Sequence, residues 1–175
     1  MSRAALLFAL SLCAACAPSQ YHPLVGHAAP EIISAEALGG DGPTTLKAAQ
    51  GKVVILDFWA TFCEPCRKSF PKYQEIADRF PGDVVVLAVS TDEPADATRE
   101  QILAFAKRTH ARFAIVWDKD GSVRARYGYP AHLPSTFLID RSGTVRYLYN
   151  GYSSWEGASI NAKVEGLVNA AESRP

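Results

Sequence analysis

Residues 53–67 read Val-Val-Ile-Leu-Asp-Phe-Trp-Ala-Thr-Phe-Cys-Glu-Pro-Cys-Arg, and they constrain the architecture more strongly than any other segment. The first half is a nearly continuous apolar run from Val53 to Trp59, which is typical of a central strand buried on both faces. The second half holds Cys63 and Cys66, with Pro65 where the first turn of a helix tolerates it. The segment therefore predicts a buried strand that leads directly into a helix carrying two cysteines.

The junction between this strand and helix gives the two cysteines different chemistry. Unpaired N–H groups and the positive end of the helix dipole stabilise a thiolate at Cys63. Cys66 lies one turn further along, within disulfide reach but less exposed. We therefore expect Cys63 to attack a substrate disulfide and Cys66 to resolve the mixed disulfide that results.

Apolar periodicity on either side of this segment predicts one α/β domain. We expect a short strand that begins at Ile32 and Ile33 and is closed by the turn-rich residues 39–43. Further strands are expected at 84–89 and 114–117, with a hairpin of 136–139 and 145–149, and helices after Cys63, from Pro94, at 122–127 and around 160–168. Alternating strand–helix units favour parallel strands, and the hairpin adds antiparallel strands at one side. The fold class is therefore α/β, with three α/β/α layers around a mixed central sheet.

The N-terminus predicts export. Arg3 precedes an apolar run that is too short for a comfortable membrane span and is arranged like a signal peptide. Ala14-Ala15-Cys16 resembles a bacterial lipobox in which Cys16 carries the lipid, although Cys13 replaces the usual leucine; a soluble secreted form and an uncleaved anchor are the alternatives. We divide the chain into a signal peptide with lipobox at 1–16, a tether at 17–24 and a single α/β domain at 25–175.

Charge and cysteine content narrow the function classes. Lys plus Arg total 18, as do Asp plus Glu, and this balance argues against a nucleic-acid partner. If Cys13 and Cys16 belong to the export signal, the other two cysteines form a pair that must be catalytic, regulatory or metal-binding in an oxidising compartment. A structural disulfide or half of a zinc site is the alternative, but a four-cysteine zinc site needs a second pair. We expect neither a cofactor nor a metal.

The sequence resembles the thioredoxin superfamily, specifically its exported TlpA/ResA-type branch, from about Val25 to Tyr149. Trp-Ala-Thr-Phe-Cys-Glu-Pro-Cys at 59–66 matches the active-site pattern of that branch, and Leu-Pro-Ser-Thr-Phe-Leu-Ile-Asp at 133–140 resembles its second landmark. The resemblance implies a thioredoxin fold and a cis proline at Pro134 beside the active-site disulfide. It also implies that Asp57, which interrupts the apolar run, is a buried proton acceptor for the resolving cysteine.

Two positions depart from that branch. ResA-like proteins often carry a glutamate three residues after the second cysteine, where this chain has Ser69, and the usual Gly-x-Pro of the second landmark is His132-Leu133-Pro134. We therefore expect the substrate groove of this chain to differ from that of other members of the branch. The alternatives are a solvated Asp57 at a strand edge and an ordinary strand-start proline at Pro134.

The cysteine pair and the resemblance together predict a thiol–disulfide oxidoreductase that reduces disulfides of exported proteins, apocytochromes c included, on the periplasmic or other extracytoplasmic face of a bacterial membrane. An unidentified membrane protein would supply its electrons. Two alternatives use the same fold. The first is a copper-handling protein of the Sco kind, which spaces its cysteines one residue further apart and uses a downstream histidine; here only His132 is available. The second is a peroxidase, which needs a Pro-x-x-x-Thr-x-x-Cys context that does not precede Cys63.

Overall fold

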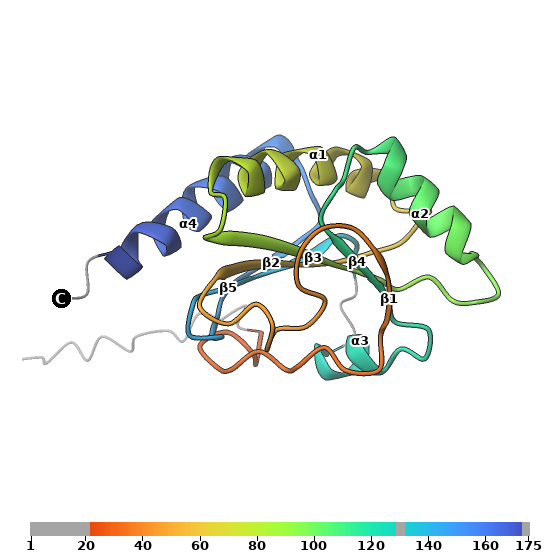
Figure 1. Cartoon of the computed structure of the whole chain (residues 1–175), viewed down its shortest axis with the longest axis horizontal. Helices are drawn as coiled ribbons and strands as arrows, with labels where there is room; N and C mark the ends of the chain where they lie inside the picture. The colour runs from red at the N-terminus through yellow and green to blue at the C-terminus, as the bar shows by residue number, and fades with distance from the viewer. Residues whose placement is uncertain (1–21, 129–131, 173–175) are drawn as a thin grey trace, which may run out of the picture.

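Strand β2, Val53–Trp59, lies at the centre of the sheet, and all of its residues are buried. The computed structural model describes residues 22–128 and 132–172 (Figure 1). The described sheet has the order β1-β4-β3-β2-β5-β6, formed by Glu36–Gly39, Ala114–Trp117, Val84–Ser90, Val53–Trp59, Ser135–Ile139 and Val145–Asn150. The predicted buried central strand is confirmed.

The sheet is mixed, as predicted. Strands β2, β3 and β4 run parallel, with helices α1 (Glu64–Arg79) and α2 (Arg99–Arg108) in the connections between them. The hairpin of β5 and β6 adds two antiparallel strands beside β2, and β1 pairs antiparallel with β4 at the other edge. The register of β2 with β5 places Thr136 opposite Asp57.

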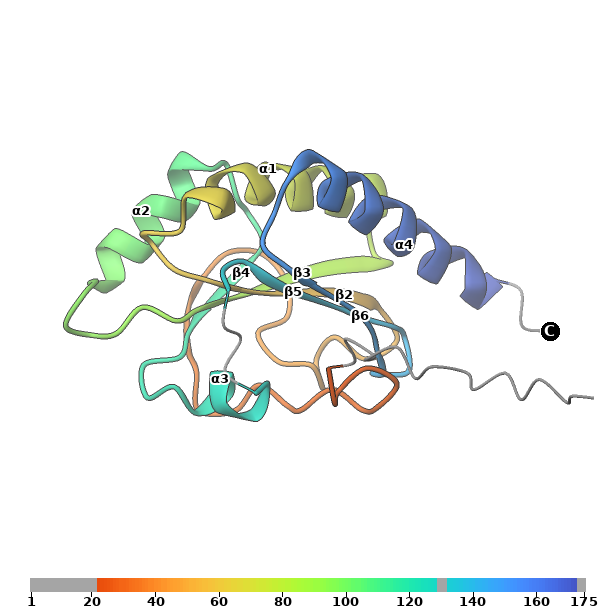
Figure 2. The ribbon, with the colours of Figure 1, turned by 180° about the vertical axis from the view of Figure 1, so that it is seen from behind.

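Two layers cover the sheet. Helices α1, α2 and α4 (Ser154–Glu172) lie on one face, and the short helix α3 (Ser122–Arg126) lies on the other with the N-terminal part of the described chain (Figures 1 and 2). Because neighbouring residues of a strand point to opposite faces, Trp59 belongs to the core beneath α1 and Phe58 to the core beneath α3. The predicted three-layer arrangement is confirmed.

The first strand begins later than the sequence predicted. Ile32 is buried in the core on the α3 side but belongs to no strand, and β1 begins four residues later at Glu36. The carboxylate of Glu31 accepts the backbone N–H groups of Ile32, Leu46 and Lys47, so the N–H of Ile32 is not free for a sheet ladder. The predicted start of this strand at Ile32 was therefore wrong, whereas its predicted end at the turn from Gly39 agrees with β1.

Helix α2 also begins later than expected. Thr98 caps it by accepting the N–H of Gln101, whose side chain returns a bond to the N–H of Thr98. This reciprocal capping box fixes the start at Arg99, although Pro94 suggested an earlier start.

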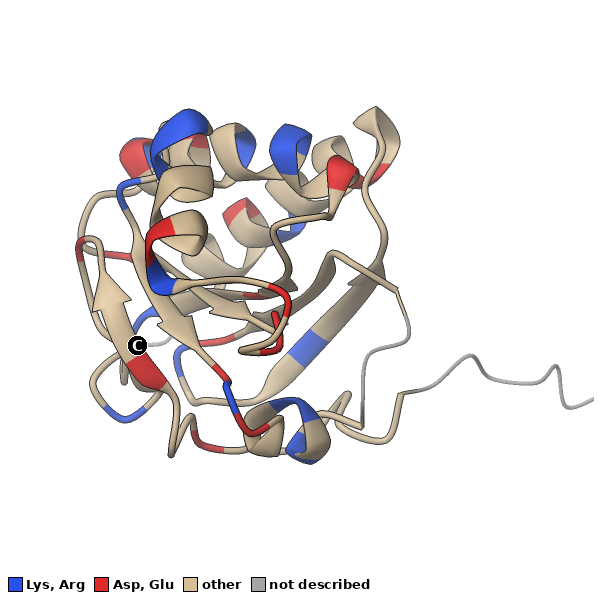
Figure 3. Ribbon diagram, turned by 90° about the vertical axis from the view of Figure 1, so that its right-hand side faces the viewer, with Lys and Arg blue, Asp and Glu red and all other residues tan. Residues whose placement is uncertain are grey.

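The chain ahead of the sheet packs against the domain from the first described residue. The ring of His22 lies edge-on to Phe137 with a centroid distance of 5.3 Å, and Leu24 packs on the same core. Cys13, Cys16 and the predicted signal peptide lie outside the described residues. Within residues 22–128 and 132–172, none of the helices has the length and apolarity to cross a membrane. The ribbon in Figure 3 shows Lys and Arg positions (blue) and Asp and Glu positions (red) interspersed along the described chain.

Candidate active site

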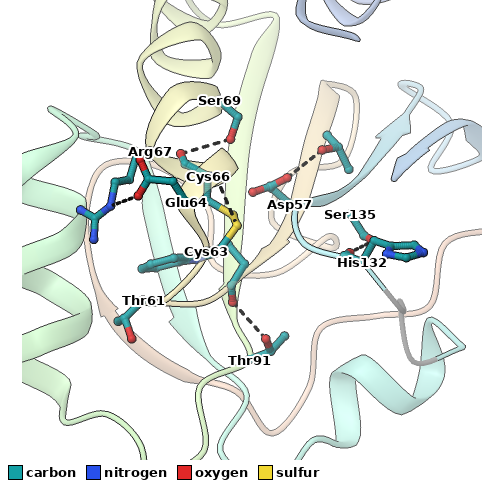
Figure 4. Close-up of a disulfide and its surroundings, with 12 residues drawn as sticks. Asp57, Thr61, Cys63, Glu64, Cys66, Arg67, Ser69, Thr91, His132 and Ser135 are labelled. Carbon is teal, nitrogen blue, oxygen red and sulfur yellow. Dashed lines mark hydrogen bonds and ion pairs between the residues drawn. A yellow bond between two sulfur atoms is a disulfide. The ribbon is translucent and has the colours of Figure 1, made fainter. Parts of the chain in front are cut away.

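The two cysteines lie where β2 leads into α1, and they form a disulfide (Figure 4). Cys63 is the N-cap residue of α1, with extended backbone angles, and its Sγ accepts the N–H of Cys66 at 3.2 Å. Pro65 falls in the first turn, where its missing N–H is not needed. The helix start therefore directs a backbone donor at the Cys63 sulfur, which stabilises a thiolate there once the disulfide is reduced.

The two sulfurs have different access. Cys63 is 4% exposed and lines a groove of about 620 Å³, whereas Cys66 is fully buried and does not line it. The groove is also lined by Phe62, which is 74% exposed, and by Leu133 from the loop before β5. A substrate that enters this groove therefore meets Cys63 first.

Asp57 is fully buried in β2, so the solvated alternative is wrong for this residue. Burial raises the pKa of the Asp57 carboxyl to about 8, and the hydroxyls of Thr136 and Tyr73 oppose that rise. The Thr136 hydroxyl donates to Asp57 Oδ1 at 2.7 Å, and Asp57 Oδ2 has no hydrogen-bond partner among the described residues. Such a carboxyl can take up or release a proton near neutral pH.

The hydrogen bonds of Asp57 extend away from the disulfide. The Tyr73 hydroxyl lies 2.8 Å from Thr136 Oγ1, and both side chains are fully buried. Sequence reasoning placed Tyr73 only on the apolar face of its helix and Thr136 only within a strand. The signal that could have linked Thr136 to Asp57 was the pairing of β5 with β2. In that register Thr136, two residues after Pro134, lies directly opposite Asp57.

The second landmark lies beside the groove. The peptide bond between Leu133 and Pro134 is cis, and Pro134 is buried immediately before β5. Ser135 donates a hydrogen bond to the carbonyl of His132, which closes the turn. His132 and Leu133 line the groove, so the departure from Gly-x-Pro changes the wall that faces Cys63.

Other residues of the active-site segment are structural. Trp59 is fully buried and packs against Phe70 and Phe105 with centroid distances of 4.9 and 4.6 Å. Ser69 is buried, and its hydroxyl donates to the carbonyl of Cys66 at 3.3 Å. The described residues contain no group of three or more His, Cys, Asp or Glu side chains that could hold a metal ion.

Comparisons with known proteins agree with this geometry. Residues 25–148 match the model of the AhpC/TSA family. The chain is 32% identical to the thioredoxin-like protein YneN of Bacillus subtilis, over 72% of this chain and 71% of that protein. It is 34% identical to the thiol–disulfide oxidoreductase ResA of Geobacillus thermodenitrificans, over 73% of this chain and 70% of that protein.

Solved structures show the same architecture. A protein assigned as a thiol:disulfide interchange protein DsbE from Chlorobium tepidum superposes with a TM-score of 0.71 at 30% identity, over 82% of this chain and 97% of that one. A protein assigned as a disulfide isomerase from Bacteroides thetaiotaomicron superposes with a TM-score of 0.70 at 28% identity, over 83% and 90%. The predicted thioredoxin fold is confirmed.

Proposed function

Because the chain belongs to the AhpC/TSA family and is a thioredoxin-fold thiol–disulfide oxidoreductase, we propose that it reduces disulfides of exported proteins through Cys63 and Cys66. The observation that carries this proposal is the unequal access of the two sulfurs. Cys63 faces a groove that a polypeptide can enter, and Cys66 is buried on the side of Asp57. A purely structural disulfide would not require one of its two sulfurs to line a groove.

The cycle has two exchange steps. The Cys63 thiolate attacks a substrate sulfur, the substrate S–S bond breaks, and one substrate thiolate leaves and takes a proton from water. Cys66 then gives its proton to Asp57 and attacks Cys63 Sγ, which forms the Cys63–Cys66 disulfide and releases the second substrate thiolate to be protonated. Two electrons have passed from the enzyme to the substrate. Insulin reduction with dithiothreitol as the electron source tests this activity, and no turnover above the dithiothreitol background would contradict it.

Two other functions of the same fold give different outcomes. Stoichiometric Cu(I) binding by the reduced protein, without insulin reduction, would favour a copper-handling role. Turnover of hydrogen peroxide faster than of insulin would favour a peroxidase.

We infer that the substrates include apocytochromes c before haem attachment and that a membrane protein returns the electrons. This rests on the resemblance of residues 59–66 to the exported branch and on the apolar N-terminal run. We place the enzyme on the outer face of the membrane, held by lipid at Cys16. Metabolic labelling of host cells with palmitate tests this placement, because the parent protein should carry the label and Cys16→Ser should not.

Phe62 is expected to hold the substrate chain. A 74% exposed aromatic ring next to the attacking sulfur can bury apolar area only when a partner covers it. Phe62→Ala should raise the KM for insulin by about tenfold, which corresponds to roughly 1.4 kcal/mol of lost contact. The rate with a small aromatic disulfide should stay within about twofold, since Cys63 is unchanged.

Trp155→Ala is the matched control for Phe62→Ala. Trp155 is 71% exposed and lines a different groove, along β6. An equal rise of KM in both variants would show that Phe62 has no specific part in docking.

We expect a reduction potential more negative than roughly −200 mV, nearer to thioredoxin at about −270 mV than to DsbA at about −120 mV. Strong oxidants heavily stabilise the thiolate of their attacking cysteine, whereas the negative charge of Glu64 beside Cys63 disfavours that thiolate. The exposed ion pair of Glu64 with Arg67, at 3.0 Å, weakens this effect. Equilibration in dithiothreitol or glutathione buffers, followed by alkylation, measures the potential. A value near the DsbA end would mean that the enzyme donates disulfides.

A further inference from the structure

We propose that Tyr73 and Thr136 are positioning residues that orient Asp57, so that Oδ2 is the oxygen that receives the proton of Cys66. The inference rests on the proposed function, because it assigns a proton-transfer geometry to the same site. Among the described residues, neither the Tyr73 hydroxyl nor the Thr136 hydroxyl forms a hydrogen bond with the sulfur of Cys63 or Cys66.

The direction of the hydrogen bonds follows from counting protons. A threonine hydroxyl has a single proton, and Thr136 donates it to Asp57 Oδ1 at 2.7 Å. The contact between Thr136 Oγ1 and the Tyr73 hydroxyl, at 2.8 Å, must then have Tyr73 as its donor. The chain therefore runs from α1 to β5 to β2, each hydroxyl donating toward the carboxylate. All three side chains are fully buried, so water does not compete for these bonds.

This arrangement distinguishes the two oxygens of Asp57. Oδ1 already accepts a hydrogen bond, whereas Oδ2 is buried without a partner among the described residues. In Figure 4 the Asp57 carboxyl lies on the side of Cys66, and the dashed line that marks its hydrogen bond points away from the disulfide. A proton that arrives from the cysteine side therefore meets the oxygen that is free to bind it.

The Asp57 carboxyl is surrounded by hydroxyl dipoles and not by oppositely charged side chains. The groups that act on Asp57 besides burial are the hydroxyls of Thr136 and Tyr73, and no ion pair of the described residues includes Asp57. Tyr73 is itself flanked by Ser69 on α1 and by the ring of Tyr152, which lies edge-on at a centroid distance of 6.0 Å. The hydroxyl chain is therefore the main structural means of favouring the ionised carboxylate.

Removing the chain should make Asp57 a less available proton acceptor. A hydroxyl that donates to a carboxylate lowers the carboxyl pKa, so its loss raises it. In Thr136→Val, which keeps the shape of the side chain, we expect the pH midpoint of mixed-disulfide resolution to rise by about one unit, or tenfold in ionised fraction. Tyr73→Phe should move it in the same direction by less, because Thr136 keeps its own bond to Asp57. Thr136→Ser should restore the parent midpoint.

The experiment measures two quantities. The first is the pH dependence of mixed-disulfide resolution in rapid-mixing experiments, and the second is the Asp57 carboxyl pKa in the disulfide form by carbon NMR. Tyr127→Phe is the matched control, since it removes another buried tyrosine hydroxyl, bonded to the Pro30 carbonyl on the opposite face of the sheet. Its midpoint should equal that of the parent.

The outcomes separate this inference from the proposed function. An unchanged Asp57 pKa in Thr136→Val, or a rate lowered equally at every pH, would overturn the positioning role whether or not the enzyme reduces disulfides. A resolution rate in Asp57→Asn equal to the parent rate would overturn the acceptor role of Asp57, even if Thr136→Val shifts the carboxyl pKa.

Discussion

Cys63→Ser is expected to abolish insulin reduction, whereas Cys66→Ser is expected to stop the cycle at a covalent mixed disulfide with the substrate. A serine hydroxyl neither ionises at neutral pH nor forms a mixed disulfide, so the Cys63→Ser rate should fall by at least about 10³-fold. Cys66→Ser keeps the attacking thiol at the helix start, with its groove, and loses only the resolving thiol. The two variants should therefore fail at different steps.

Non-reducing electrophoresis of each variant after incubation with a disulfide substrate separates these outcomes. Cys66→Ser should carry an adduct that dithiothreitol removes, and Cys63→Ser should carry none. Brief alkylation of the reduced parent should label Cys63 before Cys66, because Cys66 is fully buried. An adduct on Cys63→Ser, or faster labelling of Cys66, would reverse the two roles.

Asp57→Asn is expected to slow disulfide exchange at pH 7 by roughly 10²-fold, the lower end of what a positioned acid or base contributes. The amide has nearly the shape of the carboxyl and can accept the Thr136 hydroxyl at its oxygen, but it cannot take a proton from Cys66. Single-turnover rates of mixed-disulfide resolution measure the effect. Asp140→Asn is a control, since its carboxyl caps the turn before β6 and lies away from the groove. Equal rates in Asp57→Asn and the parent would remove Asp57 from the mechanism.

The same substitution should change how stability depends on pH. The Asp57 pKa lies near 8 in the folded disulfide form against an ordinary value of 3.8, so the folded state binds the proton more tightly. The resulting stabilisation is fully present below about pH 4 and is lost as pH rises toward 8, at up to about 1.4 kcal/mol per pH unit. Asp57→Asn lacks this titration.

Urea unfolding of the oxidised protein at pH 5 and pH 7 tests the linkage. Between these two values the free energy of unfolding of the parent should fall by up to about 2.7 kcal/mol more than that of Asp57→Asn. The disulfide form is used because its cysteines do not titrate. A parallel pH dependence in both proteins would show that Asp57 titrates alike in the folded and unfolded states.

The sequence correctly predicted the elements that follow from a local pattern of apolar and turn residues. The apolar run of β2, the second buried strand β3 and the hairpin after Pro134 all lie where periodicity and turn residues placed them. The failures came where side chains divert the backbone. Glu31 accepts the backbone N–H of Ile32, and β1 begins only at Glu36. Thr98 caps α2, so this helix begins at Arg99 and not at Pro94.

The sequence by itself determined the reactive pair, since a C-x-x-C between a buried strand and a helix start is contiguous and its chemistry follows from local geometry. It also indicated that Asp57 is unusual, because one carboxyl interrupts an apolar run. Only the tertiary structure decided what surrounds that carboxyl. Thr136 and Tyr73 lie 79 and 16 positions from Asp57 along the chain, and they meet it only after β5 pairs with β2 and α1 packs on the sheet. Burial is likewise a property of the assembled core, and it is burial that raises the carboxyl pKa toward neutrality.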